Sequence, residues 1–350
     1  MKAYEIQKFG LDGLAQVDRT VPEPGVNQVL VKMHAWSLNY RDLMTVMGRY
    51  NPRLKVPQIP LSDGAGEIVA LGSHVEGFKT GDRVANTFFE RWISGEQTDE
   101  QARTALGAGR DGVLAEYVAL HQDGIIPIPE HLTYAEAATL PCAALTAWNA
   151  IVAKGKIRPG DTILTLGTGG VSIFALQFAL LSGAEVIITS GSDEKLERAN
   201  KLGARHTINY RQKSDWGKQV RQLCGGRGVD LVVEVGGTGT FNQSIAAVRR
   251  GGTIALIGVL APGSDANILP VLMNAIRVQG IFVGSREMFS DMNRAIALHQ
   301  LHPVIDRQFG FDEFPEALRL MHAGGHFGKI VVSENQVARR IGGFSPVTNS

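Results

Sequence analysis

The feature that most constrains the fold is a cluster of glycines between two apolar runs, in LTLGTGGVSIFALQFALLSGAEVIITSGSDEKL from Leu164 to Leu196. The first run has the character of a buried strand, and the residues after the glycines have the apolar spacing of a helix. A sharp turn from strand to helix leaves the N–H groups of the first helical turn free, and a phosphate group binds readily to them. The cluster therefore predicts a strand–turn–helix unit of a nucleotide-binding sheet.

The same alternation continues toward the C-terminus and predicts a doubly wound α/β sheet. Six short apolar runs follow one another: TILTLG, EVIITS, HTIN, VDLVVEVGG, GTIALIGV and VQGIFVG. Helical patterns such as DEKLERANKLG and DWGKQVRQLCG lie between most of them. Strands that alternate with helices in this way form a parallel sheet with helices on both faces, the architecture of the Rossmann dinucleotide-binding domain.

The rest of the chain divides into a β-rich first part and a short last part. Residues 1–122 alternate strand-like runs with glycine turns, apart from a polar, weakly patterned stretch at 86–112. We assign residues 123–284 to the dinucleotide-binding domain. Residues 285–335, with two helical patterns and two strand-like runs, are expected to rejoin the first domain, and residues 336–350 to form a frayed tail.

Each position of the glycine turn has a predicted role. Gly167 allows the tight bend, and Gly169 lets the backbone approach a pyrophosphate. The helix is expected to begin near Val171, and Ser172 stands where a third glycine is usual, with a side chain small enough for close packing of helix on strand. The predicted phosphate-binding residues are Gly167, Thr168, Gly169, Gly170 and Val171.

The end of the second strand bears on which dinucleotide binds. NAD sites usually carry Asp or Glu about 20 residues beyond the turn, on the ribose hydroxyls, but this sequence has Ser190 there. A carboxylate would repel the 2′-phosphate of NADP, whereas a serine accepts it. Lys195 and Arg211 can add positive charge, and Tyr210 precedes Arg211 at the end of the third strand. We therefore expect NADP(H) to be preferred over NAD(H); the alternative interpretation of Lys195 is an ordinary solvated charge.

Composition argues against several other classes of protein. The 35 Lys and Arg residues nearly balance the 34 Asp and Glu residues, whereas nucleic-acid-binding proteins normally carry a basic excess. Two cysteines, Cys142 and Cys224, cannot build a disulfide framework or a four-cysteine zinc site. The N-terminus has no apolar signal core, and no segment reaches about 20 apolar residues. We expect a cytoplasmic protein that binds neither nucleic acid nor membrane.

The sequence resembles the medium-chain dehydrogenase/reductase superfamily over roughly residues 1–335. The resemblance is carried by AGEIVALGSHVEGFKTGDRV, by LPCAALTAWNAI, and by the glycine turn with its sheet. It is closest to the zinc-lacking, quinone-oxidoreductase-like branch. It implies a GroES-like catalytic domain at residues 1–122, a cleft between the domains, and a homodimer or homotetramer that pairs through VQGIFVG.

The departures from the zinc-containing members imply that no zinc is bound. Those members use a Cys, a His followed by an acid, and a second Cys, and the matching positions here are Asn39, Leu61-Ser62-Asp63 and Cys142. One cysteine with an Asn and a Ser does not supply the three or four Cys, His or carboxylate ligands of a zinc site. The lobe that holds a structural zinc ion in the family corresponds to residues 86–112, which contain no cysteine.

Two further features lie near the C-terminal end. His322 and His326 are four residues apart, but Gly324-Gly325 interrupts the helix between them, so we expect both to be solvated at the surface. Gly328-Lys329 matches a stretch that folds over the cofactor in the family, with a surface position as the alternative for Lys329.

The resemblance and the position of strand ends assign the other cofactor-binding residues. Thr146 matches a threonine near the nicotinamide. The carboxyl ends of the last three strands should border the nicotinamide half, mainly through their backbone. The residues expected there are Gly236, Gly258, Val259, Phe282, Val283 and Gly284.

The missing metal bears on the reaction. Oxidising a simple alcohol requires stabilisation of an alkoxide, normally by zinc, whereas hydride from NADPH can add to a conjugated carbonyl while hydrogen bonds stabilise the oxyanion. The resemblance makes Asn39 a donor to the substrate oxygen. It makes Tyr50 a proton donor or a ring that lines the cleft, and Asp42 a residue that orients its neighbours or a structural cap.

These observations predict a zinc-independent NADP(H)-dependent oxidoreductase that transfers hydride to a quinone, an enone or another activated carbonyl of a small molecule. Two alternatives remain open. One is an NAD(P)-dependent alcohol dehydrogenase, and the other is a non-catalytic NADPH-binding sensor or structural protein.

Overall fold

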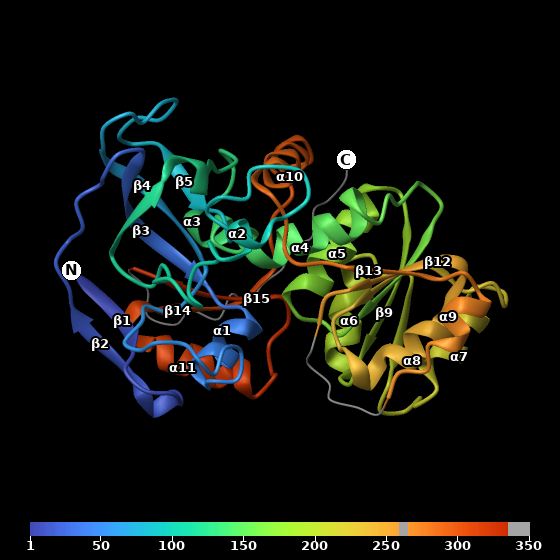
Figure 1. Cartoon of the computed structure of the whole chain (residues 1–350). Helices are drawn as coiled ribbons and strands as arrows, with labels where there is room; N and C mark the ends of the chain where they lie inside the picture. Colours follow the sequence, from blue (N-terminus) through green and yellow to red (C-terminus); the bar gives the residue numbers. More distant parts are fainter. Residues whose placement is uncertain (259–264, 335–350) are drawn as a thin grey trace, which may run out of the picture.

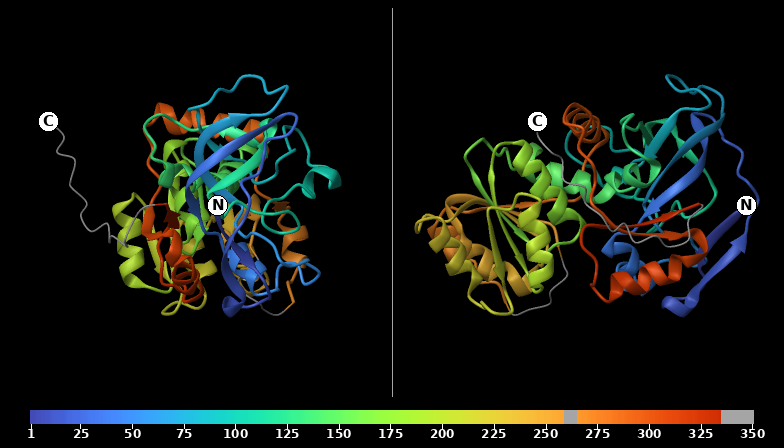
Figure 2. Two further views of the ribbon diagram at one scale, coloured as in Figure 1. Left: turned by 90° about the vertical axis from the view of Figure 1, so that its left-hand side faces the viewer. Right: turned by 180° about the vertical axis from the view of Figure 1, so that it is seen from behind.

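The computed structural model describes residues 1–258 and 265–334, and it has two lobes that lie side by side (Figure 1). One lobe contains both ends of the described chain, and the other is the nucleotide-binding type of sheet that the sequence predicts. Figure 1 places α4 (Leu145–Trp148) and α5 (Gly170–Leu181) where the lobes meet, and the right-hand view of Figure 2, from behind, shows these green helices between the lobes again. Among the described residues, no helix combines the length and the apolar character that crossing a membrane requires.

The first lobe is built on a seven-stranded sheet in the order β14-β15-β3-β4-β5-β7, with β6 also paired to β3. Its elements from the N-terminal part are β1 (Lys2–Ile6), β2 (Leu14–Asp18), β3 (Gln28–Ser37), α1 (Tyr40–Val46), β4 (Asp63–Leu71), β5 (Arg83–Asn86), α2 (Asp99–Ala102), β6 (Tyr117–His121), β7 (Ile125–Pro127) and α3 (Tyr134–Ala137). Those from the C-terminal part are α10 (Arg286–Leu298), β14 (Ile305–Gly310), α11 (Phe314–His322) and β15 (Lys329–Ser333). β15 runs antiparallel to β3, with Val332 opposite Trp36, so the last segment completes the first sheet.

The second lobe is a parallel six-stranded sheet in the order β10-β9-β8-β11-β12-β13. This is the doubly wound order, and it confirms the predicted fold. Its elements are β8 (Thr162–Leu166), α5 (Gly170–Leu181), β9 (Glu185–Ser190), α6 (Asp193–Lys201), β10 (His206–Asn209), α7 (Trp216–Leu223), β11 (Val229–Glu234), α8 (Thr238–Ala247), β12 (Val248–Leu256), α9 (Leu269–Met273) and β13 (Arg277–Gly280).

A distorted helix connects the two lobes. It begins with a π-helical turn at η3 (Leu140–Ala144), continues through α4 (Leu145–Trp148), and ends with a second π-helical turn at η4 (Asn149–Ala153). π-helical turns occur frequently at functional sites, because they widen the helix and redirect side chains. The apolar spacing of LPCAALTAWNAI predicts a helix but does not reveal this distortion.

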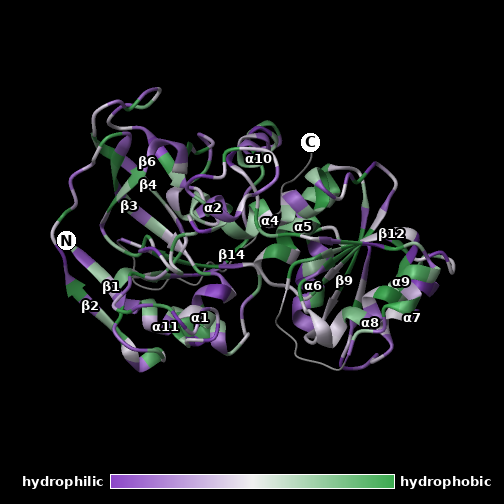
Figure 3. Ribbon diagram, viewed as in Figure 1, coloured by the Kyte–Doolittle hydropathy of each residue, from purple (hydrophilic) through white to green (hydrophobic). Residues whose placement is uncertain are grey.

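One hydrophobic core runs through both lobes. It joins Ala85 and Phe88 of the first lobe to Leu145 of the connecting helix and Phe174 of α5. α5 is apolar around most of its circumference, as Figure 3 shows, because one face lies on the sheet and the other faces the connecting helix. The continuous core holds the two lobes in a defined relation, which a site between them requires.

Candidate functional site

The glycine turn has the geometry that phosphate binding requires. Gly167 has φ of +70°, in the left-handed region that favours glycine. Gly169 is the N-cap of α5, and a Cβ atom placed on it would meet no atom within 4 Å, so its backbone borders open space. α5 begins at Gly170, beside the predicted start at Val171, and Thr168 is buried. The turn can therefore hold a dinucleotide pyrophosphate on the free N–H groups of the helix.

Ser172, in place of the third glycine, does more than leave room for packing. Its hydroxyl donates to the backbone oxygen of Leu166 at 2.6 Å, and the side chain is fully buried. This hydrogen bond ties the first turn of α5 to the end of β8, so the serine reinforces the bend that the glycines allow.

The structure brings the residues predicted for the 2′-phosphate together. Ser190 ends β9, and its backbone oxygen accepts from the Tyr210 N–H at 3.1 Å. A Cβ atom on Gly191 would lie 2.8 Å from the Tyr210 hydroxyl and 2.9 Å from Arg211 Nε. Lys195 lies at the same corner. Burial lowers the pKa of its ammonium, and the charges of nearby Arg198 and Arg211 lower it further. This is a positively charged corner with hydroxyl donors and no carboxylate on the strand end itself.

Lys195 is not a freely solvated charge. Its ammonium donates to the backbone oxygen of Gly324 at 2.8 Å, which connects α6 to the loop after α11. His326, in the same loop, is also placed differently from the prediction. It is largely buried, and burial, followed by the charges of Lys195 and Lys329, lowers its pKa to about 4. The expectation of a solvated His326 is therefore wrong, because the loop folds back against α6; His322 is exposed as expected.

At the sheet edge where the nicotinamide half is expected, the loop after β11 is held by a buried polar group. Glu234 at the end of β11 accepts from the N–H groups of Gly236 and Gly237 at 2.8 and 3.0 Å. A Cβ atom on Gly258 would lie 1.5 Å from the Val235 backbone oxygen, so only glycine fits there. Val259 lies outside the described residues.

Residues 282–284 lie beyond the sixth strand, which corrects the expectation that they end it. β13 stops at Gly280, and Val283 has φ of +56°, a conformation unusual for a β-branched residue. The Asn149 side-chain amide donates to the Val283 backbone oxygen at 2.7 Å and holds this segment in place. Such strained backbone is concentrated at functional sites. Phe282 and Gly284 flank Val283 at the same turn, and Thr146 is buried on α4.

The three predicted catalytic residues lie in α1 or next to it, just after β3 in the chain. Asn39 is the N-cap of α1 and is buried. The Asp42 carboxylate accepts from the Asn39 backbone N–H at 2.8 Å, so it caps the helix and fixes its neighbour. Burial raises the pKa of Asp42 to about 6, although nearby Arg41 lowers it. Tyr50 follows the helix, and its ring lies against the Arg41 guanidinium, 4.9 Å from centroid to carbon.

Arg41 connects the weakly patterned 86–112 stretch to this site. Its guanidinium also lies 4.7 Å from the Phe88 ring and donates to the Leu106 backbone oxygen at 2.8 Å. Phe89, next to Phe88, contacts the Phe282 ring at a centroid distance of 5.0 Å. The stretch thus packs aromatic side chains between α1 and the loop after β13, a role that its polar sequence does not reveal.

The structure rules out the alternative interpretation of Lys329 as a surface residue, and it shows a contact that sequence reasoning missed. The Lys329 side chain is buried, with 3% of the residue exposed, rather than at the surface. The ammonium donates to the Leu38 backbone oxygen at 2.6 Å and to Asn39 Oδ1 at 2.7 Å. The charges of the buried cluster therefore balance. It contains two cations, Lys329 and Arg41, and two carboxylates, Asp42 and Asp63. The local sequence carries no signal for this, because 290 residues separate Lys329 from Asn39.

The positions that match the metal ligands of zinc-containing relatives do not fit Zn²⁺. Asn39 Oδ1 faces the Lys329 ammonium, whose charge repels a metal cation. The Ser62 hydroxyl donates to Asp63 Oδ1 at 2.6 Å, and Asp63 Oδ2 accepts from the Cys142 N–H at 3.0 Å. Burial, followed by the charge of Asp63, raises the pKa of the Cys142 thiol, which disfavours the thiolate that zinc needs. In the described ranges, no three His, Cys, Asp or Glu residues are grouped so that they could hold a metal ion.

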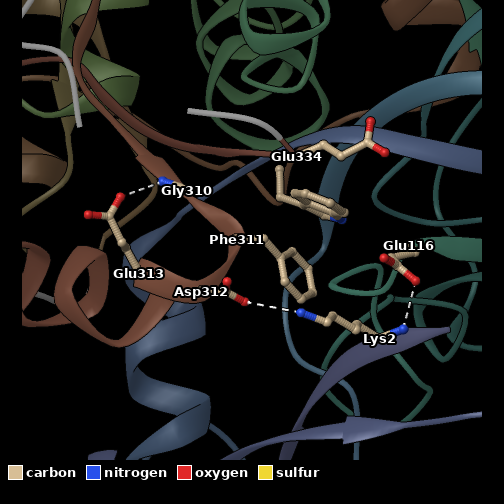
Figure 4. Close-up of a pocket in the computed structure, with 8 residues that line it drawn as sticks. Lys2, Glu116, Gly310, Phe311, Asp312, Glu313 and Glu334 are labelled. Carbon is tan, nitrogen blue, oxygen red and sulfur yellow. Dashed lines mark hydrogen bonds and ion pairs between the residues drawn. The ribbon is translucent and has the colours of Figure 1, made fainter. Parts of the chain in front are cut away.

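A separate surface pocket lies on the first lobe and shares no residue with this cluster. Trp36 and Phe311 form its apolar wall, and Asp312, Glu116 and Glu334 are among its acids (Figure 4). Lys2 bridges the acids, with its N–H on Glu116 at 2.7 Å and its ammonium 3.8 Å from Asp312. Since Lys2 pairs with Glu116 and Asp312, and Glu334 pairs with Lys32 at 3.1 Å and His34 at 2.8 Å, we interpret the pocket as a structural feature.

Comparisons with known proteins agree with this geometry. The profile of the alcohol dehydrogenase GroES-like domain matches residues 25–130, and that of the zinc-binding dehydrogenases matches residues 170–298. A zinc-type alcohol dehydrogenase-like protein of Schizosaccharomyces pombe is 44% identical over 92% of this chain and 96% of that protein.

Solved structures are similar to this chain over nearly its whole length. The crystal structure of a putative alcohol dehydrogenase from Sinorhizobium meliloti 1021 superposes with a TM-score of 0.89 and 41% identity, over 95% of this chain and 98% of that one. The quinone oxidoreductase from Coxiella burnetii superposes with a TM-score of 0.79 and 29% identity, over 96% of this chain and 99% of that one.

Proposed function

Because the chain belongs to the medium-chain dehydrogenase/reductase superfamily, as an NAD(P)-dependent oxidoreductase of the alcohol dehydrogenase-like kind, we propose that it reduces a quinone, an enone or another activated carbonyl with NADPH and without zinc. The observation that carries the proposal is the Lys329 ammonium bonded to Asn39 Oδ1, at a position where zinc-containing relatives have a metal ligand. A buried cation at this position leaves no place for a second one.

Without zinc, the reaction depends on the cofactor and on the side chains of Asn39 and Tyr50. The bound cofactor would supply hydride from its nicotinamide ring to the electrophilic carbon of the acceptor. The electron pair displaced from the carbonyl then accumulates on oxygen, where Asn39 Nδ2 can donate a hydrogen bond. A single well-placed donor of this kind contributes on the order of 3 kcal/mol to the transition state. Tyr50, or water, supplies the proton that completes the hydroquinone from a quinone, the alcohol from a carbonyl, or the enol that becomes the saturated ketone from an enone.

The preference for NADP(H) rests on the corner formed by Ser190, Tyr210, Arg211 and Lys195. A 2′-phosphate carries negative charge and several acceptor oxygens, and this corner offers hydroxyl groups with two cationic side chains. The nearest acid on α6, Asp193, is already engaged by Asn209 at 2.6 Å and Gln212 at 3.1 Å. The ribose hydroxyls of NAD would therefore find no free carboxylate at the end of β9.

A homodimer, or a tetramer built from such dimers, is part of the proposal. β13 is an edge strand paired only with β12 in the described part of the chain, and its residues are exposed. The preceding α9 exposes Leu269, Leu272 and Met273, and its N-cap Ile268 is exposed as well. An open edge next to exposed apolar side chains favours pairing with another strand. A second copy related by a twofold axis presents the same edge and the same apolar surface.

The test is a panel of quinones, enones and aldehydes, assayed with NADPH and NADH, with and without a chelator, on untagged protein whose metal content is measured. We expect turnover with activated acceptors, a higher kcat/KM with NADPH, and no effect of the chelator. Loss of activity with the chelator and its return with Zn²⁺ would favour an alcohol dehydrogenase, the second candidate, which the names of several relatives support. Tight NADPH binding without any turnover would favour a sensor.

A further inference from the structure

The side chain of Asn39 does not do what an N-cap asparagine usually does. At this position, asparagine commonly accepts hydrogen bonds from the backbone of the first helical turn. Here the Asn39 side chain makes no capping hydrogen bond to the first helical turn, although the capping-box arrangement is present; the measured bond of that box is the one that the Asp42 carboxylate accepts from the Asn39 N–H at 2.8 Å. The Asn39 amide instead turns its oxygen toward Lys329, at 2.7 Å.

Lys329 determines the orientation of the Asn39 side-chain amide. An ammonium group has three donors and no acceptor, so only the Asn39 oxygen, not its NH₂ group, can face it. Nδ2 must therefore point away from Lys329. In this orientation Nδ2 is buried, and none of the residues that the structure describes places an acceptor within hydrogen-bonding distance of it. Burial raises the pKa of Asp63, and Lys329, Ser62 and the Asn39 amide lower it, so one of the two Nδ2 hydrogens is partly engaged by that carboxylate and the other is left without an acceptor in the described part of the chain.

A buried donor without an acceptor is costly, about 1–3 kcal/mol, and such groups are rare. The cost is recovered if an acceptor arrives with the substrate. An oxygen atom that gains negative charge during hydride transfer is the acceptor that gains most from a preoriented donor.

Lys329 also connects the Asn39 amide to the glycine turn. The Gly328 N–H, next to the lysine, donates to the Thr168 backbone oxygen at 2.9 Å. The lysine side chain passes over Gly170, where an added Cβ atom would lie 2.6 Å from Lys329 Cδ. Its ammonium then bonds to Leu38 and Asn39, which belong to the first lobe as Lys329 does, whereas Thr168 and Gly170 belong to the second. One side chain therefore sets the distance between the phosphate-binding turn and the Asn39 amide.

We propose that Lys329 is a positioning residue, which locks the Asn39 amide so that Nδ2 donates to the substrate oxygen during hydride transfer. This inference rests on the proposed function. In the step, hydride would leave a C–H bond of the reduced nicotinamide, which loses two electrons, and form a C–H bond at the acceptor carbon; the π electron pair moves to oxygen, and a proton from water, directly or through Tyr50, completes the O–H bond. Lys329 neither gains nor loses a proton; it holds the amide and places a positive charge behind it.

The first test compares Lys329→Met, nearly the same length without charge, with Lys201→Met on the exposed face of α6. Lys329→Met should lower kcat on the order of 10²-fold, while the dissociation constant of NADPH changes much less. Lys201→Met should change neither. A large loss of NADPH affinity with kcat preserved would overturn the proposal and make Lys329 a cofactor-binding residue only.

A double-mutant cycle separates positioning from an independent effect. If Lys329 acts through Asn39, then Lys329→Met should add little to the loss that Asn39→Ala already causes, because the two changes remove one interaction. Losses that multiply would overturn the proposal. Asn39→Asp serves as a second variant: it keeps an acceptor for Lys329 but removes the donor, so it should fold and lose as much kcat as Asn39→Ala.

A readout without turnover distinguishes failure of this inference from failure of the proposed function. In ligand-free protein, the side-chain amide NMR signal of Asn39, assigned by its loss in Asn39→Asp, should shift and broaden in Lys329→Met and stay in place in Lys201→Met. An unchanged signal would overturn the positioning role even in an active, zinc-free enzyme. A shifted signal in a protein that needs Zn²⁺ for turnover would instead refute the proposed function while the Lys329–Asn39 contact stands.

Discussion

At the scale of single residues, the buried carboxyl of Asp42 should make stability depend on pH. Burial raises its pKa to about 6 in the folded protein, from a usual value of 3.8. The stabilisation that the proton provides is present below about pH 4 and is lost as the pH rises through about 6. Asp42→Asn keeps an acceptor for the Asn39 N–H without a charge. Relative to the parent, it should gain up to about 3 kcal/mol between pH 4 and pH 7.

Thermal unfolding of both proteins across this pH range measures the effect. Asp291→Asn, on the exposed face of α10, is the control and should show no such trend. A stability difference between Asp42→Asn and the parent that does not change with pH would contradict the prediction.

His326 should produce a pH dependence of the opposite sign. Burial lowers its pKa to about 4 in the folded protein, from 6.5. Its contribution to stability is present above pH 6.5 and is lost as the pH falls toward 4, because the unfolded chain takes up the proton first. His326→Gln should therefore lose less stability than the parent on acidification through this window. His322→Gln, at an exposed position of the same segment, should behave like the parent; equal effects of the two changes would show that the burial of His326 is not the cause.

At the scale of elements, a substitution in the turn between β8 and α5 should weaken cofactor binding without weakening the fold. Gly169 has φ of −79°, which any residue can adopt, and open space where a Cβ atom would lie. Gly169→Ala should therefore leave the melting temperature of the ligand-free protein unchanged or slightly raised. The added methyl group would occupy the space into which a pyrophosphate must come, so NADPH affinity should fall at least about tenfold, or 1.4 kcal/mol. Calorimetric titration checks this, and undiminished affinity would place the phosphates elsewhere.

The elements also show how far the sequence alone reaches. The strand order of the second sheet and the start of α5 could be predicted, because each depends on a local pattern of apolar residues and glycines. The end of β13 at Gly280 and the left-handed Val283 could not, since VQGIFVG continues its strand-like pattern through both. Beyond the end of the strand, the segment is held by a tertiary contact, the hydrogen bond from Asn149 to the Val283 backbone oxygen, which the local pattern does not reveal. The Lys329–Asn39 contact was missed for the same reason, because it joins the two ends of the chain.

At the scale of the whole molecule, the proposed dimer makes the final prediction. Leu272 on α9 is 76% exposed beside the open edge of β13, and Leu298 at the end of α10 is 78% exposed away from that edge. Because both side chains are solvated in the single chain, Leu272→Glu and Leu298→Glu should fold equally well. If a second copy covers α9 and β13, a buried charge at 272 would cost several kcal/mol per subunit. Light scattering on eluting protein should then show the parent and Leu298→Glu as dimers or larger multiples and Leu272→Glu as a monomer. A monomeric parent, or the same shift in both variants, would contradict this interface, because only the position of the charge differs between them.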